Sequence, residues 1–391
     1  MVYIDRAIEA AITKALARGK SVLLLGPRQT GKTTLVKRQR HDLHINFITP
    51  GVRQRFEQNP NLLIGELEAL RTKIQAPPRV ILDEVQKVPE ILDVVQDLID
   101  RDVASFILTG SSARKLRQQG QANLLPGRVV SLRLDPLCLN EVHGAALESL
   151  LLDGSLPGLV AVENPDDREI DLASYVTTYL EEEVRAEALV RKLGPFARFL
   201  EYAAADSGRL INAHKLSQEI GVSHPTIQSY FQILEDCLII ERLDPVTRSQ
   251  TRKKLIRGQK YLFFDLGVCR LAAREGRQLP RESMGHLFEQ FIGLELLRIA
   301  RSKHPQYRLR FWRDPDGPEV DWVLDTPEGY IPVEVKWTDK PTINDARHMH
   351  VFLNEYPGIK TGYILCQVPR PIQLSRTVLA LPWQEIQQVF M

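Results

Sequence analysis

The sequence has few cysteines and little net charge for its length of 391 residues. Its four cysteines lie far apart and form no C-x-x-C pair, so neither a disulfide framework nor a structural zinc site is predicted. They are Cys138, Cys237, Cys269 and Cys366. Lysine and arginine total 51 against 49 aspartate and glutamate residues, and the resulting charge of +2 favours no particular class of partner.

Long apolar runs are also absent. No stretch approaches the ~20 apolar residues of a membrane-spanning helix, and residues 1–20 alternate charged and apolar positions instead of forming the apolar core of a secretory signal. We therefore expect a cytoplasmic protein without a membrane segment. The composition, 43% hydrophobic and 26% charged, is that of a globular protein, and the length predicts two or three domains.

Short apolar segments alternate with amphipathic ones in the first third of the chain. The expected strands are 21–25, 45–48, 80–82, 105–109 and 128–134. The expected helices are 3–18, 33–40, 61–74 and 89–99. This alternation predicts an α/β fold in which helices cover both faces of a mostly parallel sheet.

One segment matches the phosphate-binding pattern G-x-x-x-x-G-K-[ST] and lies between an expected strand and an expected helix, as the motif requires. It reads Gly26, Pro27, Arg28, Gln29, Thr30, Gly31, Lys32, Thr33 and Thr34. The glycines let consecutive N–H groups turn toward phosphate oxygens. Lys32 can reach the β- and γ-phosphates, and the Thr33 hydroxyl can bind Mg²⁺. The segment predicts a site for ATP with Mg²⁺. The alternative is an incidental glycine turn, which would not need a strand before it and a helix after it.

Asp83 and Glu84 end the apolar strand 80–82 and are predicted to complete the nucleotide site. We expect the Asp83 carboxylate to hold Mg²⁺ and Glu84 to orient or deprotonate the attacking water. Thr109 and Ser111, at the end of the next strand, are candidates to sense the γ-phosphate. A solvated turn is the alternative for the acidic pair, and its place after a buried strand argues against it.

Hydrolysis of ATP is often accelerated by an arginine near the γ-phosphate, which a neighbouring subunit can supply and which can be worth ~10³ to 10⁵ in rate. Arg128 is the first candidate for this role and Arg114 the second. For each, the alternative is a surface arginine beside a strand. If Arg128 acts in trans, we expect a homo-oligomer, with a hexameric ring as one form.

Residues 210–243 resemble a winged helix-turn-helix, with helices at 214–220 and 226–235 around a turn that contains Gly221 and Ser223. The residues expected to face a DNA groove are His224, Thr226, Gln228 and Ser229. A basic run follows, with Arg248, Arg252, Lys253, Lys254, Arg257 and Lys260. These features predict contact with DNA phosphates; the alternative is a motif that only packs domains together beside a solvated hairpin.

Two strand-like segments near the C-terminus carry acidic residues at positions that a hairpin would bring together. Asp321 lies in the first, and Glu334 and Lys336 lie on one side of the second. Glu289 lies upstream on an expected helix. The four residues resemble the PD-(D/E)xK nuclease core, except that valine precedes Asp321 where that motif has proline. The resemblance implies that Asp321 and Glu334 bind Mg²⁺, Lys336 activates water and Glu289 completes the site for phosphodiester hydrolysis.

Nearly the whole chain resembles a prokaryotic family of AAA-type ATPases with a C-terminal domain of formerly unknown function. The segments that carry the resemblance are 24–34, 80–89, 108–112, 125–129, 175–183 and 264–267. The resemblance implies four units: an AAA-type P-loop ATPase domain (1–140), a helical connector (141–200), a winged helix-turn-helix (201–265) and a restriction-endonuclease-like domain (266–391).

The leading hypothesis is a DNA-processing ATPase with a metal-dependent nuclease-like domain. The alternative is an ATP-dependent regulatory switch that binds DNA or protein through a catalytically inactive nuclease-like domain. A metabolic kinase would also use the phosphate loop, but it would give no reason for the helix-turn-helix and the C-terminal carboxylates.

Overall fold

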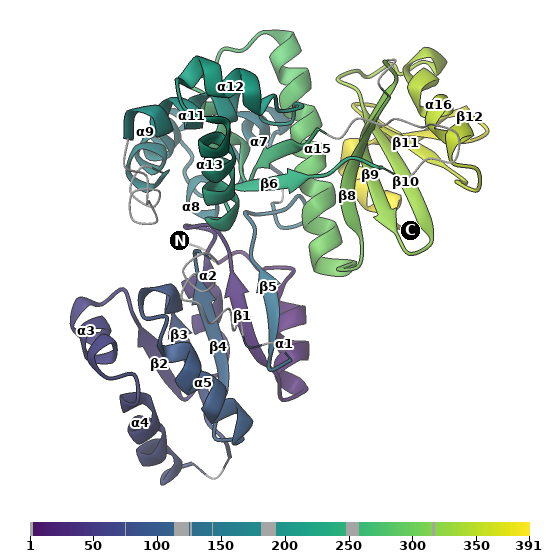
Figure 1. Cartoon of the computed structure of the whole chain (residues 1–391). Coiled ribbons are helices and arrows are strands. Elements are labelled where there is room, and N and C mark those ends of the chain that lie inside the picture. The colour runs from purple at the N-terminus through teal and green to yellow at the C-terminus, as the bar shows by residue number, and fades with distance from the viewer. Residues whose placement is uncertain are drawn as a thin grey trace.

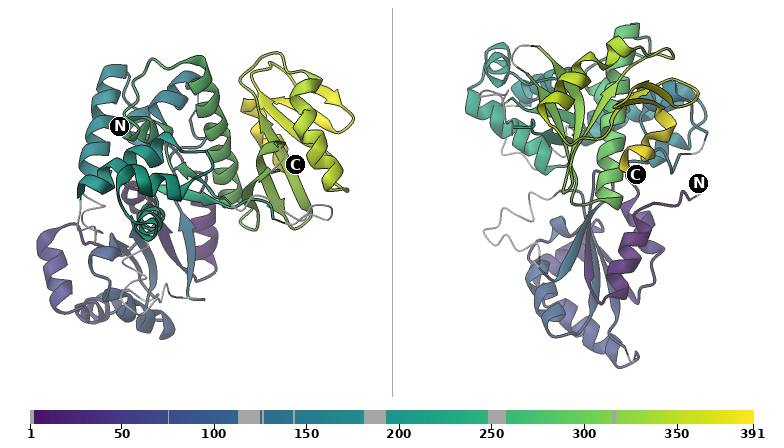
Figure 2. Two further views of the ribbon diagram at one scale, coloured as in Figure 1. Left: turned by 45° about the horizontal axis from the view of Figure 1, so that its top comes forward. Right: turned by 90° about the vertical axis from the view of Figure 1, so that its right-hand side faces the viewer.

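The structure, a computed structural model, describes residues 3–74, 76–112, 125, 127–142, 144–180, 193–247, 258–314 and 317–391. It has an N-terminal α/β domain, drawn at the bottom of Figure 1, and an upper part in which a helical module lies beside a C-terminal sheet. The right-hand view of Figure 2 shows that the molecule narrows where these parts meet. Within the described ranges, no helix has both the length and the apolar character needed to cross a membrane.

The N-terminal domain is built on five parallel strands in the order β2-β3-β4-β1-β5. The strands are β1 (Ser21–Leu25), β2 (Leu43–Asn46), β3 (Arg79–Asp83), β4 (Ser105–Gly110) and β5 (Val129–Arg133). The predicted parallel α/β sheet is therefore confirmed. Since the strands are parallel, the ends of β1, β3 and β4 meet at one edge, where the nucleotide loop and Asp83 lie.

Helices cover both faces of this sheet, as predicted. They are α1 (Glu9–Ala17), α2 (Lys32–Lys37), α3 (Pro50–Gln58), α4 (Leu62–Arg71) and α5 (Ile91–Asp100). Side chains alternate along β1: Val22 and Leu24 pack in the core with α1 and α2, whereas Leu23 and Leu25 pack in the core with α3 to α5. Helix α3 was not predicted because only Phe56 is buried along it, so it shows no apolar period.

The middle module is largely helical. Its elements are α7 (Leu147–Asp153), α8 (Pro157–Val160), α9 (Pro165–Ser174), the π-helical turn η2 (Tyr175–Leu180), α11 (Leu193–Ala205), α12 (Ala213–Ile220), α13 (His224–Asp236), β6 (Ile240–Leu243), β7 (Lys260–Phe263) and α14 (Leu266–Ala272). Its core holds a cluster of aromatic rings in which Phe231 stacks on Tyr261 with centroids 4.4 Å apart. Strands β6 and β7 pair antiparallel in the region where the sequence predicts a wing, and the name wing is kept for this pair.

The C-terminal domain is a six-stranded mixed sheet in the order β12-β13-β11-β10-β9-β8. Its elements are α15 (Arg281–Lys303), β8 (Arg308–Arg313), β9 (Glu319–Thr326), β10 (Gly329–Val335), the short helix η3 (Ile343–Ala346), α16 (Arg347–Glu355), β11 (Gly362–Cys366), β12 (Ile372–Ser375), β13 (Val378–Pro382) and the helical segment η4 (Trp383–Phe390). The cores on its two faces are separate: one contains residues of α15, and the other contains residues of α16.

Asp265, in the segment 264–267 that carries part of the family resemblance, joins two parts of the middle module. Its buried carboxylate accepts hydrogen bonds from the backbone N–H of Val268 (3.1 Å), which caps α14, and of Ser155 (2.7 Å). Burial raises the pKa of Asp265, although these hydrogen bonds act in the opposite direction. Gly154 lies against the carboxylate with φ of +73°, and a Cβ there would be 2.0 Å from Asp265 Oδ1. Only glycine fits this junction.

We expect Gly154→Ala to lower the free energy of unfolding by about 2 kcal/mol, because the new methyl group meets Asp265 in a left-handed backbone conformation. Urea denaturation of both proteins measures the change. Gly65→Ala in α4 is the matched control, because no atom lies near its added Cβ, and it should stabilise the helix by about 0.5–1 kcal/mol. Equal shifts for the two variants would contradict the account of Asp265.

Candidate nucleotide site and C-terminal carboxylate site

The nucleotide loop connects the end of β1 to the start of α2. Gly31 has φ of +93° and Gln29 has φ of +61°, so the loop turns twice through the left-handed region. Gly26 lies against the backbone after β5, where a Cβ would be 2.3 Å from the carbonyl oxygen of Leu134. The glycine spacing seen in the sequence is therefore required by the backbone. Residues Arg28, Gln29, Gly31, Lys32, Thr33 and Thr34 line one pocket.

Lys32 lies across the loop with its side chain buried. Its Nζ donates hydrogen bonds to the carbonyl oxygens of Gly26 and Pro27, both at 2.9 Å. Burial lowers the pKa of Lys32 to about 8, although the negative charges of Glu84 and Asp83 act to raise it. The ammonium is thus held at the place where phosphate oxygens would replace the two carbonyl groups.

Thr33, Asp83 and Thr109 form a chain of hydrogen bonds below the loop. Thr33 Oγ1 donates to Asp83 Oδ2 at 2.8 Å, and Thr109 Oγ1 donates to the other oxygen of Asp83. Thr109 Oγ1 also accepts from the backbone N–H of Glu84 at 3.0 Å. A hydroxyl and a carboxylate side by side are the oxygen ligands that Mg²⁺ prefers, so these residues fit that ion. Thr109 is completely buried on Asp83, so in this arrangement it touches the carboxylate rather than the pocket.

Glu84 is held by Ser111, which was predicted as a site residue, and by Gln86, which was not. It has φ of +62°, and its carboxylate accepts from Ser111 Oγ at 3.2 Å and from the Gln86 amide. Gln86 also donates to Ser111 Oγ at 2.9 Å. Gln86 lies in the turn η1 (Val85–Lys87), two residues after the acidic pair. This position near Glu84 was the sequence signal that could have identified it as a site residue.

The middle module contributes to the nucleotide pocket. Pro157 and Gly158 of α8 line it together with Arg53 of α3 and Lys87. The Tyr175 hydroxyl donates to the carbonyl oxygen of Arg28 in the loop at 3.2 Å. Sequence reasoning missed these residues because they lie far from the phosphate motif and only the fold brings them to it.

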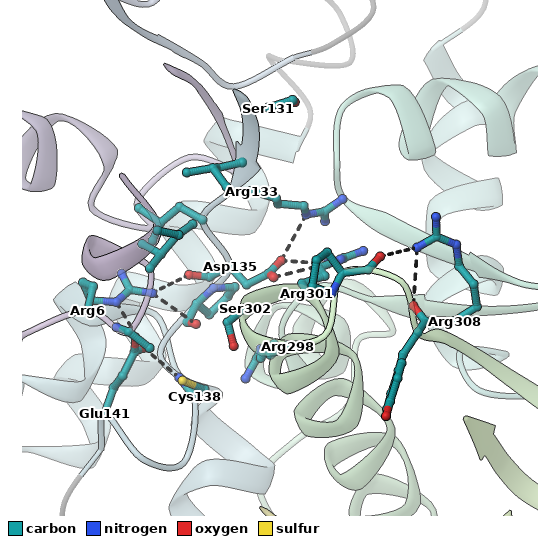
Figure 3. A pocket seen from close by; sticks show the side chains of 18 residues that line it. Arg6, Ser131, Arg133, Asp135, Cys138, Glu141, Arg298, Arg301, Ser302 and Arg308 are labelled. Atoms are coloured by element: carbon teal, nitrogen blue, oxygen red, sulfur yellow. Dashed lines mark hydrogen bonds and ion pairs between the residues drawn. The ribbon is translucent and has the colours of Figure 1, made fainter. Parts of the chain in front are cut away.

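Arg6 connects the nucleotide loop to the segment that leads into the middle module. Figure 3 shows Arg6 beside Glu141 of that segment. Its guanidinium donates to the carbonyl oxygens of Thr30 and Asp135, both at 2.7 Å. It also forms an ion pair with Glu141 at 3.1 Å, and both side chains are almost fully buried. The same Glu141 carboxylate accepts from the backbone N–H groups of Ala7 (2.7 Å) and Cys138 (3.0 Å).

A second group of charges continues from this point to α15, as Figure 3 shows around Asp135. Asp135 pairs with Arg133 and with Arg301 of α15, both at 3.0 Å. Glu241 of β6 pairs with the same two arginines. Burial raises the pKa of Asp135, but the positive charges of Arg301 and Arg133 outweigh that effect and lower it. Through Arg133 and Arg301, the charged form of Asp135 is connected to Glu241 in the wing. These ion pairs therefore join the N-terminal domain, the wing and α15.

Arg128 lies at the opposite end of the sheet from the nucleotide loop. It immediately precedes β5 and pairs with Asp100, at the end of α5, at 2.6 Å. Within one chain it cannot reach the phosphates, so the role predicted for it requires the site of a neighbouring molecule. Arg114 lies outside the described residues.

The helix-turn-helix has the predicted local geometry. Gly221 ends α12 with φ of +77°, and Ser223 Oγ caps α13 by accepting from the backbone N–H of Thr226 at 3.4 Å. Ile227, Tyr230 and Leu234 are buried and pack in the core of the middle module. The exposed side chains of α13 include His224, Gln228, Ser229 and Gln232.

The basic run after the helix-turn-helix needs a correction. Lys260 was expected to contact phosphates, but it is only 7% exposed and points into the protein. Its backbone pairs with Leu243 in the wing, and this register places it on the buried side. Arg248, Arg252, Lys253, Lys254 and Arg257 lie outside the described residues.

The hairpin predicted near the C-terminus is present as β9 and β10. The strands pair antiparallel, with Trp322 opposite Val333, so the next residues, Asp321 and Glu334, lie side by side. Asp321 Oδ2 accepts from the backbone N–H of Val335 at 2.8 Å, and Lys336 Nζ donates to Glu334 Oε1 at 2.6 Å.

Glu289 of α15 lies beside Lys260 and His286. Lys260 Nζ is 3.5 Å from Glu289 Oε1, and His286 Nδ1 is 3.9 Å from Oε2. Burial alone would raise the pKa of Glu289, but the hydrogen bond from His286 and the charge of Lys260 lower it. Burial raises the pKa of Asp321 well above its ordinary value, and the negative charges of Glu334 and Glu289 add to that effect.

The C-terminal carboxylates do not fit a divalent cation in this arrangement. In the part of the chain that the structure describes, no three histidine, cysteine, aspartate or glutamate side chains lie close enough together to hold a metal ion. Instead, Asp321 accepts a hydrogen bond from the backbone N–H of Val335, and Glu334 accepts one from Lys336. Glu289 is paired with Lys260. Glu334 Oε2 is buried and has no hydrogen-bond partner.

The sheet order, the nucleotide loop and the Thr33–Asp83 contact define an AAA-type P-loop domain. Residues 18–143 match the family described as an AAA domain, and such a domain implies ATP binding. Residues 144–278 and 284–386 match two families described as domains of unknown function, DUF8612 and DUF4143. The matches thus follow one another along the chain, with the AAA domain first and the two domains of unknown function after it.

Two mycobacterial proteins are similar to the chain along nearly its whole length. The uncharacterized protein Rv2008c of Mycobacterium tuberculosis is 28% identical over 394 residues, covering 99% of this chain and 85% of that protein. The uncharacterized protein Mb2031c of Mycobacterium bovis gives the same values.

Among solved structures, a RuvB variant from Thermotoga maritima aligns with 61% of this chain and 90% of its own, at 14% identity and a TM-score of 0.28. The Pif1 helicase from Candida albicans aligns with 45% of this chain and 48% of its own, at 14% identity and a TM-score of 0.25. Scores of this size carry no argument about function.

We expect ATP binding at pH 8.5 to take up protons, because phosphate charges replace the loop carbonyls around Lys32 and raise its pKa from about 8. Between this value and the ordinary 10.5 the folded, nucleotide-free protein binds fewer protons than the unfolded chain, so Lys32 adds stability as pH rises above 8. Calorimetry in two buffers of different ionisation enthalpy measures the uptake.

Two variants locate this proton uptake. Lys32→Met should abolish it and weaken ATP binding. Lys37→Met removes an exposed lysine from the same helix and should leave both unchanged. Uptake that persists in Lys32→Met would show that another group supplies the proton site.

Proposed function

We propose that this protein is an ATP-hydrolysing, DNA-associated protein in which the nucleotide site is shared between the AAA domain and the module that carries the helix-turn-helix. The observation that carries the proposal is the pocket lined by Lys32 and Thr33 on one side and by Pro157 and Gly158 on the other. A nucleotide bound there contacts both units, so its binding and hydrolysis can change how they are arranged.

The residues of the AAA domain support hydrolysis as well as binding. Lys32 would exchange the two loop carbonyls for phosphate oxygens. Thr33 and Asp83 would hold Mg²⁺, which supplies charge neutralisation at the phosphates. Glu84, fixed by Ser111 and Gln86, would orient the attacking water.

DNA is the proposed partner because of the exposed surface of α13. Its first turns present His224, Gln228, Ser229 and Gln232, which are polar and can donate hydrogen bonds. The capped N-terminus of α13 follows a tight turn, as in helices that enter the major groove. We propose that this DNA is double-stranded or branched.

The C-terminal domain is proposed to be nuclease-like. One helix, α15, is followed by β8, β9 and β10, then by α16 and β11, and the acidic residues lie on α15, β9 and β10. This order supports the proposal that Glu289, Asp321, Glu334 and Lys336 form the nuclease-like site that the sequence resemblance implied. The competing proposal is a regulatory switch with an inactive nuclease-like domain, and the closed carboxylate site favours it.

An oligomer remains a proposal that depends on Arg128. Its ion pair with Asp100 is partly exposed, so a neighbouring molecule could compete for the guanidinium. A ring in which each Arg128 approaches the γ-phosphate of the next subunit is consistent with its position at the far end of the sheet.

We expect Gln228→Glu to weaken binding of duplex DNA about tenfold while ATP turnover without DNA stays unchanged, since one lost base contact typically costs ~1–3 kcal/mol. Fluorescence anisotropy with a labelled duplex measures the affinity. Gln58→Glu, on exposed α3, is the matched control because it adds the same charge away from α13. Equal affinity of both variants would exclude α13 as the DNA contact.

If the C-terminal site cleaves, linear, single-stranded or branched DNA should be cut with Mg²⁺ or Mn²⁺, and Asp321→Ala should reduce cleavage to background because it removes a cation ligand. Gel assays with and without ATP measure it, and Lys32→Ala shows whether nucleotide controls it. ATP-dependent DNA binding without Asp321-dependent cleavage would establish the switch instead.

A further inference from the structure

Helix α3 is placed at the nucleotide site by the strand that precedes it. In the register of β2 and β3, Asn46 lies opposite Asp83, and the next backbone N–H, of Phe47, donates to the Asp83 carbonyl oxygen at 3.0 Å. The chain therefore leaves β2 at the edge of the sheet where Asp83 and the nucleotide loop lie. Since α3 begins at Pro50, its first turn lies beside that edge.

The packing of α3 aims one arginine of its first turn at the nucleotide. Phe56 is the buried residue of the helix, and its ring meets that of Phe47 edge to face, with centroids 5.6 Å apart. Arg53 lies three residues before Phe56, and helical side chains lean toward the N-terminus, which here is the end that begins beside Asp83. The Arg53 side chain accordingly lines the same pocket as Lys32 and Glu84.

This pocket carries more positive charge than the loop lysine supplies. Among the described residues that line it, four side chains are basic and one, that of Glu84, is acidic. The basic residues are Arg28, Lys32, Arg53 and Lys87. Hydrolysis of ATP needs a positive charge at the γ-phosphate in addition to the loop lysine and Mg²⁺. The composition of the pocket indicates that the chain can supply this charge itself.

A phosphate can replace the present partner of Arg53 at little cost. Arg53 Nε is 3.6 Å from Glu57 Oε1, and 38% and 49% of these two side chains are exposed. An exposed ion pair of this kind contributes little stability, whereas a guanidinium can bind two phosphate oxygens at once. Arg55 of the same helix is directed elsewhere, since it pairs with Glu66 of α4 at 3.0 Å.

We propose that Arg53 binds the γ-phosphate of ATP from within the same chain and stabilises the charge that develops there during hydrolysis. Water adds to the γ-phosphorus as the bond to the bridging oxygen breaks, giving ADP and phosphate, and the water proton is taken up by Glu84. Arg53 exchanges no proton and contributes only charge and hydrogen bonds. The inference rests on the proposed ATP hydrolysis and assigns to this chain a contact that would otherwise need an arginine of a neighbouring molecule, such as Arg128.

The test compares Arg53→Ala with the unchanged full-length protein in the presence of Mg²⁺. Calorimetry measures the binding of ADP and of the non-hydrolysable ATP analogue AMP-PNP, and phosphate release at saturating ATP measures turnover. Because ADP lacks the γ-phosphate, Arg53→Ala should weaken AMP-PNP binding about tenfold and leave ADP binding unchanged. Turnover per chain should fall at least ~100-fold.

Two further variants locate the effect. Arg55→Ala removes a guanidinium from the same helix and should leave both affinities and turnover unchanged. Arg53→Lys keeps the charge without the forked geometry, so it should recover part of the lost AMP-PNP affinity. Circular dichroism shows whether each variant is folded, and Arg53→Gln replaces Arg53→Ala with the same expectation if the latter does not fold.

Turnover in Arg53→Ala equal to that of the unchanged protein overturns the proposal and leaves ATP hydrolysis standing. Equal losses of ADP and AMP-PNP affinity also overturn it, because Arg53 would then not act at the γ-phosphate. Phosphate release that occurs only at protein concentrations where the molecules associate would assign the contact to a neighbouring molecule instead. An unchanged protein that binds neither nucleotide would overturn the proposed function together with this inference.

Discussion

The arrangement of the whole molecule depends on the buried guanidinium of Arg6. It holds the carbonyl oxygen of Thr30 in the nucleotide loop, the carbonyl oxygen of Asp135 and the carboxylate of Glu141. Removing one partner of a buried ion pair typically costs ~3–5 kcal/mol because the other charge stays buried. The loop that would bind phosphates is therefore tied directly to the chain segment that enters the middle module.

From that segment, ion pairs continue to the rest of the protein. Asp135 and Glu241 share Arg133 and Arg301, and Arg298 of α15 donates to the carbonyl oxygens of Leu137 and Phe264 at 3.1 and 3.0 Å. Such buried charges have defined partners and few alternative arrangements. A change at the nucleotide loop and a change at the wing must therefore be accommodated by the same set of contacts.

The two polar sites use lysine in different ways. In the AAA domain Lys32 is bound by two carbonyl oxygens of its own loop, which phosphate oxygens can replace. At the C-terminal site, Lys336 of that domain and Lys260 of the middle module are paired with carboxylates. Lys32 can therefore exchange carbonyl oxygens for phosphate oxygens, whereas Lys336 and Lys260 are already paired with negative charges of the protein.

The sequence by itself determined the parallel sheet, the phosphate loop, the two helices around Gly221 and the β9–β10 hairpin. Each shows in a local pattern: the alternation of apolar and amphipathic segments, a motif of fixed spacing, or a turn between neighbouring elements. It could not place Arg6 on Thr30, Pro157 at the nucleotide pocket or Lys260 at Glu289, since no motif or fixed spacing connects the residues of these contacts. Only the tertiary structure decided that Lys260 faces inward, because burial depends on how β7 packs against α15 and not on the basic residues around it in sequence.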